Sequence, residues 1–247
     1  MPQIKDSLYE QLYPLTTIAG QRFVDDFSGD AVDVKRWGFG GWVVADGVGN
    51  SAVMSDEING GLLLTTSGTG TNSGLTMSFL AGTNTTGEDN MSVIAIPVRQ
   101  FASGLCNMIF TMRMNMAVGN VTNVGGGFSE TSRPDMAGDN MALLRGANGQ
   151  TEFQLRTSNS GGSQNDTNTD VAFDNNWHTY KILSNFTADP TPAGTGVTLF
   201  IDGVLKATNT SAIGYFNENV APLFCINRNS TTSISANIGY CEAWNTL

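Results

Sequence analysis

The stretch WHTYKILSNFTADPTPAGTGVTLFIDGVLKAT, residues 177–208, decides the fold class. It contains three strand patterns, of which a loose loop separates the first two and a tight turn separates the last two. Asp202 and Gly203 form that turn, because an Asp-Gly pair between alternating runs is typical of a two-residue β-hairpin and glycine adopts positive φ without strain. The stretch therefore predicts three successive antiparallel strands.

The stretch CNMIFTMRMNM, residues 106–116, is the clearest single strand. Apolar and polar side chains alternate along it with a period of two, with Ile109 as the one exception on the polar face. The apolar face consists of Cys106, Met108, Phe110, Met112, Met114 and Met116. The pattern predicts a half-buried antiparallel strand. Its methionines favour filling of the core, and the alternative is a pliable binding groove.

The rest of the chain from residue 21 onward alternates between short apolar runs and turn residues. Glycine is abundant at 29 of 247 residues, hydrophobic residues make up 40% and charged residues only 14%. This composition supplies a core, many turns and a surface of amides and hydroxyls. We therefore predict an all-β protein of two packed antiparallel sheets, in which residues 157–170 and 185–196 form flexible loops.

Residues 1–20 differ from the rest and are predicted to form an N-terminal arm, followed by one sandwich domain at residues 21–247. Ile4, Leu8 and Leu12 are four residues apart, which is the spacing of one helix face. A helix of about 10 residues is unstable alone in water, so this stripe must pack either on its own domain or on a partner. The arm is predicted to be a short helical or extended segment, with these three residues as candidates for docking on a partner.

The charge and the cysteines argue against several classes of protein. A formal net charge of −10, with only 12 lysines and arginines, argues against binding to nucleic acid or to anionic membranes. The three cysteines, Cys106, Cys225 and Cys241, are too few for a disulfide framework, and whether Cys225 and Cys241 pair stays open. No Cys-x-x-Cys pair or Cys/His cluster points to zinc. The N-terminus has no apolar run of the signal-peptide kind, so we expect the chain to fold in the compartment where it is made.

The order of these strand patterns resembles a known superfamily. WHTYKI, then GVTLFIDGVLKAT, then ANIGYCEAW resemble the C-terminal half of the concanavalin A-like lectin and glucanase jelly rolls, which include laminin-G-like domains. DDFSGDAVDVKRWGF resembles the first strand of that superfamily and IFTMRMNMAVGNVTNVGGGFSET its central pair, so the likeness covers most of residues 21–247. The resemblance implies a two-sheet antiparallel jelly-roll sandwich. It does not decide function, because the superfamily includes lectins, glycan-cleaving enzymes and structural modules.

The catalytic motif of the glycan-cleaving members is missing from the sequence. The resemblance implies an E-x-D-x-x-E or E-x-D-x-E strand whose carboxylates act as nucleophile and acid/base, yet no glutamate here is followed two residues later by aspartate. The related lyases carry a Gln-Ile-His strand, but the one histidine, His178, lies in NWHTYK. A packing or hydrogen-bonding histidine beside Trp177 is favoured over a general base. We therefore expect a protein that is not an enzyme and needs no cofactor.

Two kinds of ligand site have candidates in the sequence. Trp37 and Trp42 lie near glycine-rich backbone in RWGFGGW and are candidate sugar-stacking residues, although tryptophan in a sandwich is usually core. Asp135 and Asp139, with Asn140, lie in a loop that offers oxygen ligands to calcium. No D-x-D-x-D-G register accompanies them, so turn residues that cap their own backbone are favoured and no metal is predicted.

These observations favour a virion structural protein of a bacterial virus, either a capsid decoration or a head or tail fibre component, assembled in the host cytoplasm. The missing signal peptide, the lysine-poor polar surface and the N-terminal arm motivate this hypothesis, which also rests on a resemblance to Gly/Asn/Thr-rich coat proteins of such viruses. Its expected partners are other virion proteins or further copies of the chain, and cell-surface glycan. The alternatives are a soluble carbohydrate-binding, lectin-like module and a glycan-cleaving enzyme with an unrecognised site.

Overall fold

The computed structural model consists of β-strands and their connections in every part of the chain that it describes. It describes residues 22–28, 38–43, 51–55, 61–66, 73–78, 89–90, 104–115, 123–129, 141–147, 149–158, 164–186, 196–209, 221–228 and 234–246. Within these ranges no helix is long and apolar enough to cross a membrane. The N-terminal arm, residues 1–20, lies outside the described residues.

One sheet, which we call sheet A, contains eight strands in the order β14-β13-β12-β7-β16-β4-β3, with β1 also paired to β16. Its strands are β1 (Arg22–Asp25), β3 (Ser51–Met54), β4 (Leu62–Thr65), β7 (Gly104–Asn115), β12 (Trp177–Phe186), β13 (Val197–Ile201), β14 (Val204–Asn209) and β16 (Ser235–Thr246). Every neighbouring pair is antiparallel.

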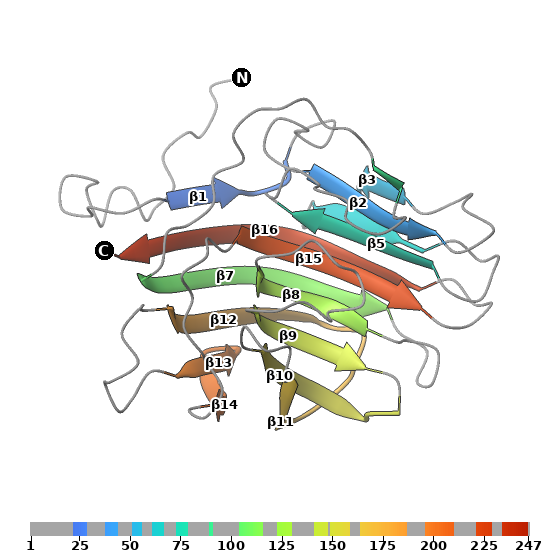
Figure 1. The fold of residues 1–247 in the computed structure, drawn as a ribbon. Helices are drawn as coiled ribbons and strands as arrows, with labels where there is room; N and C mark the ends of the chain where they lie inside the picture. The colour runs from blue at the N-terminus through green and yellow to red at the C-terminus, as the bar shows by residue number, and fades with distance from the viewer. Residues whose placement is uncertain are drawn as a thin grey trace.

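The other sheet, sheet B, also contains eight strands, in the order β11-β10-β9-β8-β15-β5-β2-β6. Its strands are β2 (Gly38–Val43), β5 (Ser73–Ser78), β6 (Asp89–Asn90), β8 (Asn123–Ser129), β9 (Met141–Ala147), β10 (Glu152–Ser158), β11 (Gln164–Ala172) and β15 (Ala221–Arg228). These pairs are antiparallel too, and Figure 1 shows the two sheets as layers lying one over the other. The prediction of a two-sheet antiparallel sandwich is confirmed.

Strand β7 shows the alternation that its sequence predicts. Met108, Phe110, Met112 and Met114 are buried with at most 1% of their surface exposed, whereas Ile109 between them is only half-buried. The methionines therefore fill the core between the sheets, as a period of two with one apolar face requires.

Aromatic rings from both sheets meet in the centre of the core. Phe110 of β7 stacks on Tyr180 of β12 with ring centroids 5.2 Å apart, and both strands belong to sheet A. Phe224 of β15 meets Phe110 edge-on at 5.3 Å, and Phe153 of β10 meets Tyr180 edge-on at 5.6 Å. Since Phe224 and Phe153 belong to sheet B, these contacts join the two sheets.

The hairpin between β13 and β14 has the predicted two-residue turn. Asp202 and Gly203 occupy it with φ of 51° and 78°, so both central residues are left-handed as a type I′ turn requires. Beyond this hairpin, β14 reaches across to sheet B, where Asn209 Nδ2 donates to Thr157 Oγ1 of β10 at 2.7 Å. This buried bond ties the two sheets together at one end of the sandwich.

One predicted loop is instead a strand. Residues 157–170 were expected to form a flexible loop, but Gln164–Ala172 is the edge strand β11, paired along β10. Its exposed positions alternate with half-buried or buried ones, namely Asn165, Thr167, Thr169 and Val171. The period of two is therefore present, but it consists almost entirely of polar residues. Asparagine and aspartate have low strand propensity, and here pairing with β10 outweighs that propensity.

Candidate functional site

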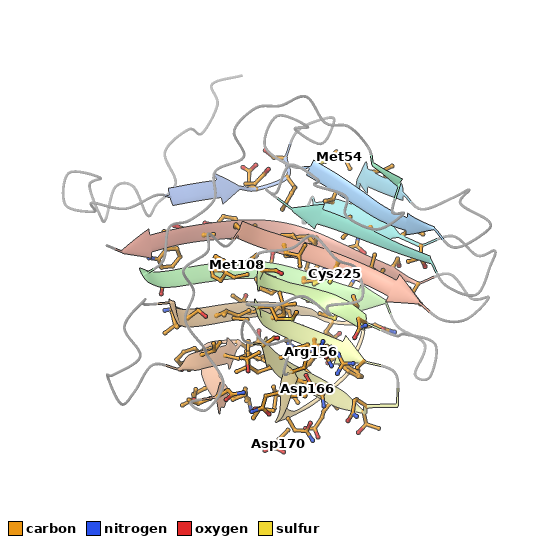
Figure 2. The ribbon with its side chains drawn as sticks, viewed as in Figure 1. Met54, Met108, Arg156, Asp166, Asp170 and Cys225 are labelled. Atoms are coloured by element: carbon orange, nitrogen blue, oxygen red, sulfur yellow. The ribbon has the colours of Figure 1, made fainter. Side chains whose placement is uncertain are left out.

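The outer face of sheet B carries a network of polar side chains beside the edge strand β11. In β9, Leu144 faces the core, so Arg145 faces outward; in β10, Leu155 faces the core, so Arg156 faces outward. The register places Arg156 opposite Asp166 of β11. Figure 2 shows Arg156 and Asp166 close together at this end of the sheet.

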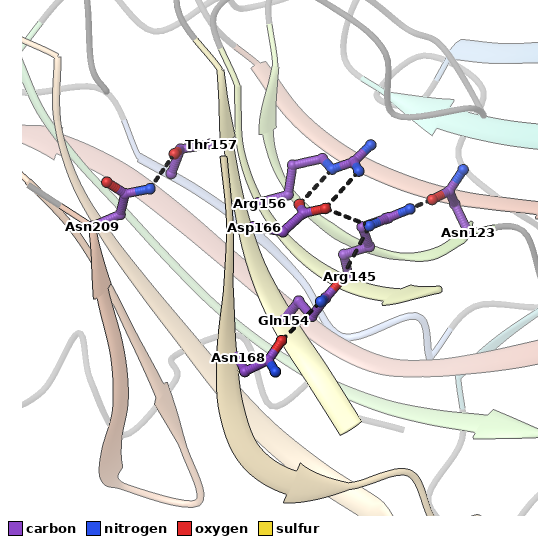
Figure 3. Close-up of polar contacts among 8 residues, drawn as sticks. All are labelled: Asn123, Arg145, Gln154, Arg156, Thr157, Asp166, Asn168 and Asn209. Carbon is purple, nitrogen blue, oxygen red and sulfur yellow. Dashed lines mark hydrogen bonds and ion pairs between the residues drawn. The ribbon is translucent and has the colours of Figure 1, made fainter. Parts of the chain in front are cut away.

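One carboxylate in this network accepts hydrogen bonds from two guanidinium groups. Arg156 donates from Nε to Asp166 Oδ1 at 2.7 Å and from Nη2 to Oδ2 at 2.8 Å, which is a bidentate ion pair. Arg145 donates from Nη1 to the same Oδ2 at 2.6 Å (Figure 3). Asp166 therefore holds both arginine side chains in place on the sheet.

Amide side chains extend the network over four strands. Arg145 Nε donates to Asn123 Oδ1 of β8 at 2.7 Å, and Arg145 Nη1 donates to Gln154 Oε1 at 3.1 Å. Gln154 in turn donates from Nε2 to Asn168 Oδ1 of β11 at 2.9 Å. We call these six residues the arginine network; its members are Asn123, Arg145, Gln154, Arg156, Asp166 and Asn168.

The arginine network is partly removed from water, which perturbs its titrating groups. Burial by itself would raise the pKa of Asp166, but the hydrogen bonds from Arg156 and the charges of both arginines outweigh it and lower that pKa. Burial lowers the pKa of Arg145, and the neighbouring charge of Arg156 lowers it further. Asp166 is therefore ionised near neutral pH and does not supply a proton there.

An apolar cluster lies beside the arginine network on the same face. Its members, Met141, Leu143, Leu223 and Cys225, are all buried. Across the sheet, Gly127 of β8 lies between Leu143 of β9 and Leu223 of β15. In the same way, Gly125 of β8 lies between Arg145 of β9 and Cys225 of β15. Among the described residues of this face, Gln164 and Asn168 are exposed on its polar side toward β11.

Among the predicted ligand residues, only Trp42 lies in the described part of the chain. The register of β2, β5, β15 and β8 runs from Trp42 through Gly74 and Asn227 to Asn123, so the backbone of Trp42 lies in the same register row as Asn123. Trp37, the docking residues Ile4, Leu8 and Leu12, and the calcium candidates Asp135, Asp139 and Asn140 lie outside it. In the described ranges no three His, Cys, Asp or Glu side chains are grouped so as to hold a metal ion.

His178 forms a second polar cluster, on sheet A. Its Nδ1 lies 2.6 Å from Asp202 Oδ2 and its Nε2 lies 2.9 Å from Asp174 Oδ1. Asp202 Oδ1 also accepts from the backbone N–H of Thr179 at 2.9 Å. Burial would lower the pKa of His178, but the bonds to the two carboxylates outweigh it and raise that pKa. The contacts are those of a hydrogen-bonding histidine that fixes the β13–β14 turn to the start of β12.

Stability is expected to depend on pH through His178. The pKa of His178 is higher in the folded protein than its unfolded value of 6.5. Protonated His178 therefore stabilises the fold below pH 6.5, and this contribution is lost as pH rises through the folded pKa. The pKa values of Asp174 and Asp202 are lowered, so their contribution is lost in acid, as pH falls through their folded values. Because both carboxylates are largely exposed, we expect a loss of less than about 1 kcal/mol between about pH 5.5 and about pH 8.5.

The measurement is urea unfolding at the two pH values, for the native chain and for His178→Gln. Since the sequence has a single histidine, the variant should show a smaller change in unfolding free energy than the native chain. An equal change in both proteins would contradict the assignment.

Cys225 and Cys241 do not pair. Neither forms a disulfide and both are buried, Cys225 in the outer apolar cluster of sheet B and Cys241 in the core between the sheets. Burial raises the pKa of the Cys241 thiol well above its ordinary value, and the charges of Asp25 and Glu242 add to this. The thiol is therefore protonated and unreactive.

Comparison with solved structures places this geometry in a known fold. The fold is that of the concanavalin A-like jelly rolls. A β-1,3-glucanase from Mycobacterium marinum superposes with a TM-score of 0.57 at 12% identity, over 90% of this chain and 97% of the glucanase. The Emp47p carbohydrate recognition domain superposes with a TM-score of 0.55 at 12% identity, over 92% of this chain and 95% of that domain.

A third similar structure is larger than this chain. The GlcNAcα1-4Gal releasing endo-β-galactosidase from Clostridium perfringens has a TM-score of 0.57 at 11% identity, over 91% of this chain. The chain spans 62% of the length of that enzyme. No family model matches the sequence, and no curated protein matches it.

These comparisons correct the expectation that the protein is not an enzyme. Most of the similar solved structures are glycan-cleaving enzymes, such as the endo-β-galactosidase, the Mycobacterium marinum glucanase and a Bacillus licheniformis β-glucanase. The missing E-x-D-x-x-E strand therefore does not exclude catalysis. The described strands do hold two acidic residues four apart, Asp166 and Asp170 of β11, although β11 and β10 shift register beside Asp170.

Proposed function

We propose that this protein binds carbohydrate on the outer face of sheet B, at the arginine network beside β11. The observation that carries the proposal is the ordered set of guanidinium and amide groups fixed across four neighbouring strands. Such groups offer the paired donors and acceptors that sugar hydroxyls require, and a rigid sheet holds them in one geometry.

The fold and the strand register also support a binding site on the outer face of sheet B. The similar solved structures include two glucanases and a carbohydrate recognition domain, and this chain shares their fold. Trp42 lies in the register row that contains Asn123, and tryptophan is a residue type suited to stack on a sugar ring.

The test is a glycan array probed with the full chain, followed by titration of the best ligand. Asn168→Ala removes an exposed amide of the arginine network and should weaken binding about fivefold, the effect of one neutral hydrogen bond of about 1 kcal/mol. Thr208→Ala, at an exposed position of β14 on sheet A, is the matched control and should bind like the native chain. Equal losses in the two variants, or no glycan bound by the native chain, would overturn the proposal. Release of reducing ends from the bound glycan is measured in parallel, since it decides whether binding leads to cleavage.

We further propose that the carbohydrate-binding face is displayed on a virion of a bacterial virus. The support comes from the sequence, namely the lysine-poor composition and the apolar stripe Ile4, Leu8 and Leu12 in the N-terminal arm. In this role the arm contacts other virion proteins or further copies of the chain, and many copies raise the avidity for a glycan surface. The arm lies outside the described residues, so its docking role stays a prediction.

A further inference from the structure

We propose that pH regulates carbohydrate binding at the arginine network, because protonated His178 holds the end of β11 in place and neutral His178 releases it. His178 acts together with two carboxylates, Asp174 and Asp202, and we call these three residues the His178 clamp. This inference rests on the proposed carbohydrate-binding function and names the regulation of that site. It is carried by the two hydrogen bonds of His178 and by the contacts that lead from Asp174 to β11.

Both ring nitrogens of His178 face carboxylate oxygens. Nδ1 lies 2.6 Å from Asp202 Oδ2 and Nε2 lies 2.9 Å from Asp174 Oδ1, so the protonated ring donates to both. The neutral ring has a single N–H, so its other nitrogen presents a lone pair to a carboxylate oxygen at hydrogen-bond distance. That contact is repulsive, and therefore one of the two contacts opens when His178 loses its proton.

The contact with Asp174 is the one that opens. Asp202 lies in the tight β13–β14 turn, and its Oδ1 also accepts the backbone N–H of Thr179 at 2.9 Å, which holds it beside the ring. Asp174 lies in the connection between β11 and β12, with 41% of its side chain exposed. It also accepts two hydrogen bonds from Asn176 of the same connection. Asp174 and Asn176 can therefore move away from the ring together.

The neighbours of His178 leave its titration as the one that operates the clamp near neutral pH. Within the described ranges, the charged groups that contact it are Asp174 and Asp202, and the pKa values of both are lowered, so both stay ionised where His178 titrates. Tyr180 of β12 has its ring centroid 6.0 Å away, and burial raises the pKa of its phenol well above the ordinary value. β10 contributes Phe153, at 6.1 Å, which does not titrate.

The end of β11 depends on side-chain contacts for its position. β11 pairs with β10 up to Asn168, and after a register shift it pairs again at Ala172, which lies opposite Glu152. Beside this shift Asp170 has φ of 57°, and Thr169 Oγ1 donates to the carbonyl oxygen of Phe153 at 2.7 Å. A ladder interrupted in this way holds the last residues of the strand less firmly than a continuous ladder does.

The His178 clamp acts on this interrupted end. Phe173 follows β11 directly, and its ring meets that of Phe153 edge-on at 4.8 Å, while Asp174 is the next residue along the chain. On β10, Phe153 immediately precedes Gln154, which donates to Asn168 within the arginine network. Release of Asp174 therefore loosens Phe173 and the end of β11, and the network offers a less ordered set of groups to a sugar.

The test repeats the glycan array and the titration with the full chain at two pH values. The probes are neutral oligosaccharides, whose own charge does not change with pH. We expect binding to weaken about fivefold between about pH 5.5 and about pH 8.5, the lower end of the usual coupling between two sites. The affinity should follow the titration of the His178 ring by NMR, which is unambiguous because the chain has a single histidine.

Asp174→Asn is the decisive variant. An asparagine amide offers an oxygen to protonated His178 and an N–H to neutral His178, so the contact persists at both pH values and the affinity should not change with pH. The matched control is Asp26→Asn, because Asp26 is an exposed aspartate that also accepts the backbone N–H of the residue two positions later, Ser28. It should keep the native pH dependence. Both variants keep the α-amino group, which titrates in the same range.

A second measurement needs no glycan. With labelled alanine methyl groups, the NMR order parameter of Ala172 should fall as His178 loses its proton, with the same midpoint as the ring titration. Ala207, which is buried in β14, is the control and should not change.

The outcomes separate this inference from the proposed function. A native chain that binds neutral glycans equally at both pH values would overturn the regulation and leave carbohydrate binding intact. A pH dependence that persists in Asp174→Asn, or an Ala172 order parameter that does not follow the His178 titration, would also overturn it. A chain that binds no glycan at either pH would overturn the proposed function, and the regulation with it.

Discussion

Replacing Phe110 with alanine is expected to lower the free energy of unfolding by about 3–5 kcal/mol, the cost of removing a fully buried aromatic side chain from a packed core. Phe110 has no exposed surface and its ring contacts Tyr180 of its own sheet and Phe224 of the opposite sheet. The substitution therefore removes both a stacked and an edge-on ring contact and leaves a cavity between the sheets.

Urea unfolding followed by tryptophan fluorescence measures this loss. The matched control is Val53→Ala in β3, because Val53 is a large hydrophobic residue with 48% of its surface exposed. The control should change stability by less than about 0.5 kcal/mol. A loss below about 1 kcal/mol in Phe110→Ala would mean that the ring is not a central contact between the sheets.

Gly127→Ala is expected to destabilise the protein by about 2–4 kcal/mol, because steric overlap and backbone strain add at this position. Gly127 has φ of 155°, and a Cβ built there would overlap the carbonyl oxygen of Ala142. The same Cβ would lie 2.9 Å from Cδ1 of Ile182, which belongs to the opposite sheet. β8 must therefore shift away from both β9 and sheet A to accept a methyl group.

Gly149→Ala is the matched control for the overlap at Gly127. Gly149 has φ of 76° but a Cβ there would meet nothing within 4 Å, so alanine brings backbone strain without overlap. Its cost is expected to be about 1 kcal/mol. Equal losses in the two variants by urea unfolding would show that the close approach of β8 to its neighbours is not what Gly127 provides.

The sandwich was predictable from sequence because its core strands have clear apolar alternation. β7 shows this through its apolar and polar alternation, which predicts a half-buried strand. The Asp202-Gly203 pair shows it too, because such a pair predicts a two-residue hairpin turn. β11 shows the limit of such patterns. Its period of two consists of Asn, Asp and Thr, which is also the composition of a flexible loop, so only its pairing with β10 distinguishes the two.

The arginine network could not be predicted for the same reason. Asp166 lies in the segment that was expected to be a loop, and Arg145 and Arg156 come from different strands. Their meeting depends on the register of three strands, which no spacing in the sequence reports. The one available signal was that Arg145 and Arg156 each follow a core-facing leucine and so face outward. This signal identifies a polar face of the sheet but not the residue that pairs with the arginines.

The place of β16 in sheet A has a consequence for how the protein is made. β16 is the last described strand along the chain, yet it lies between β7 and β4 and also pairs with β1, the first described strand. Its Ala236, Ile238, Cys241 and Ala243 complete the core. Until this segment has emerged from the ribosome, sheet A has a gap at its centre, and the edges of β7 and β4 that pair with β16 have no neighbour. Sheet A therefore cannot close until β16 has been synthesised, and unpaired strand edges are prone to aggregation in that interval.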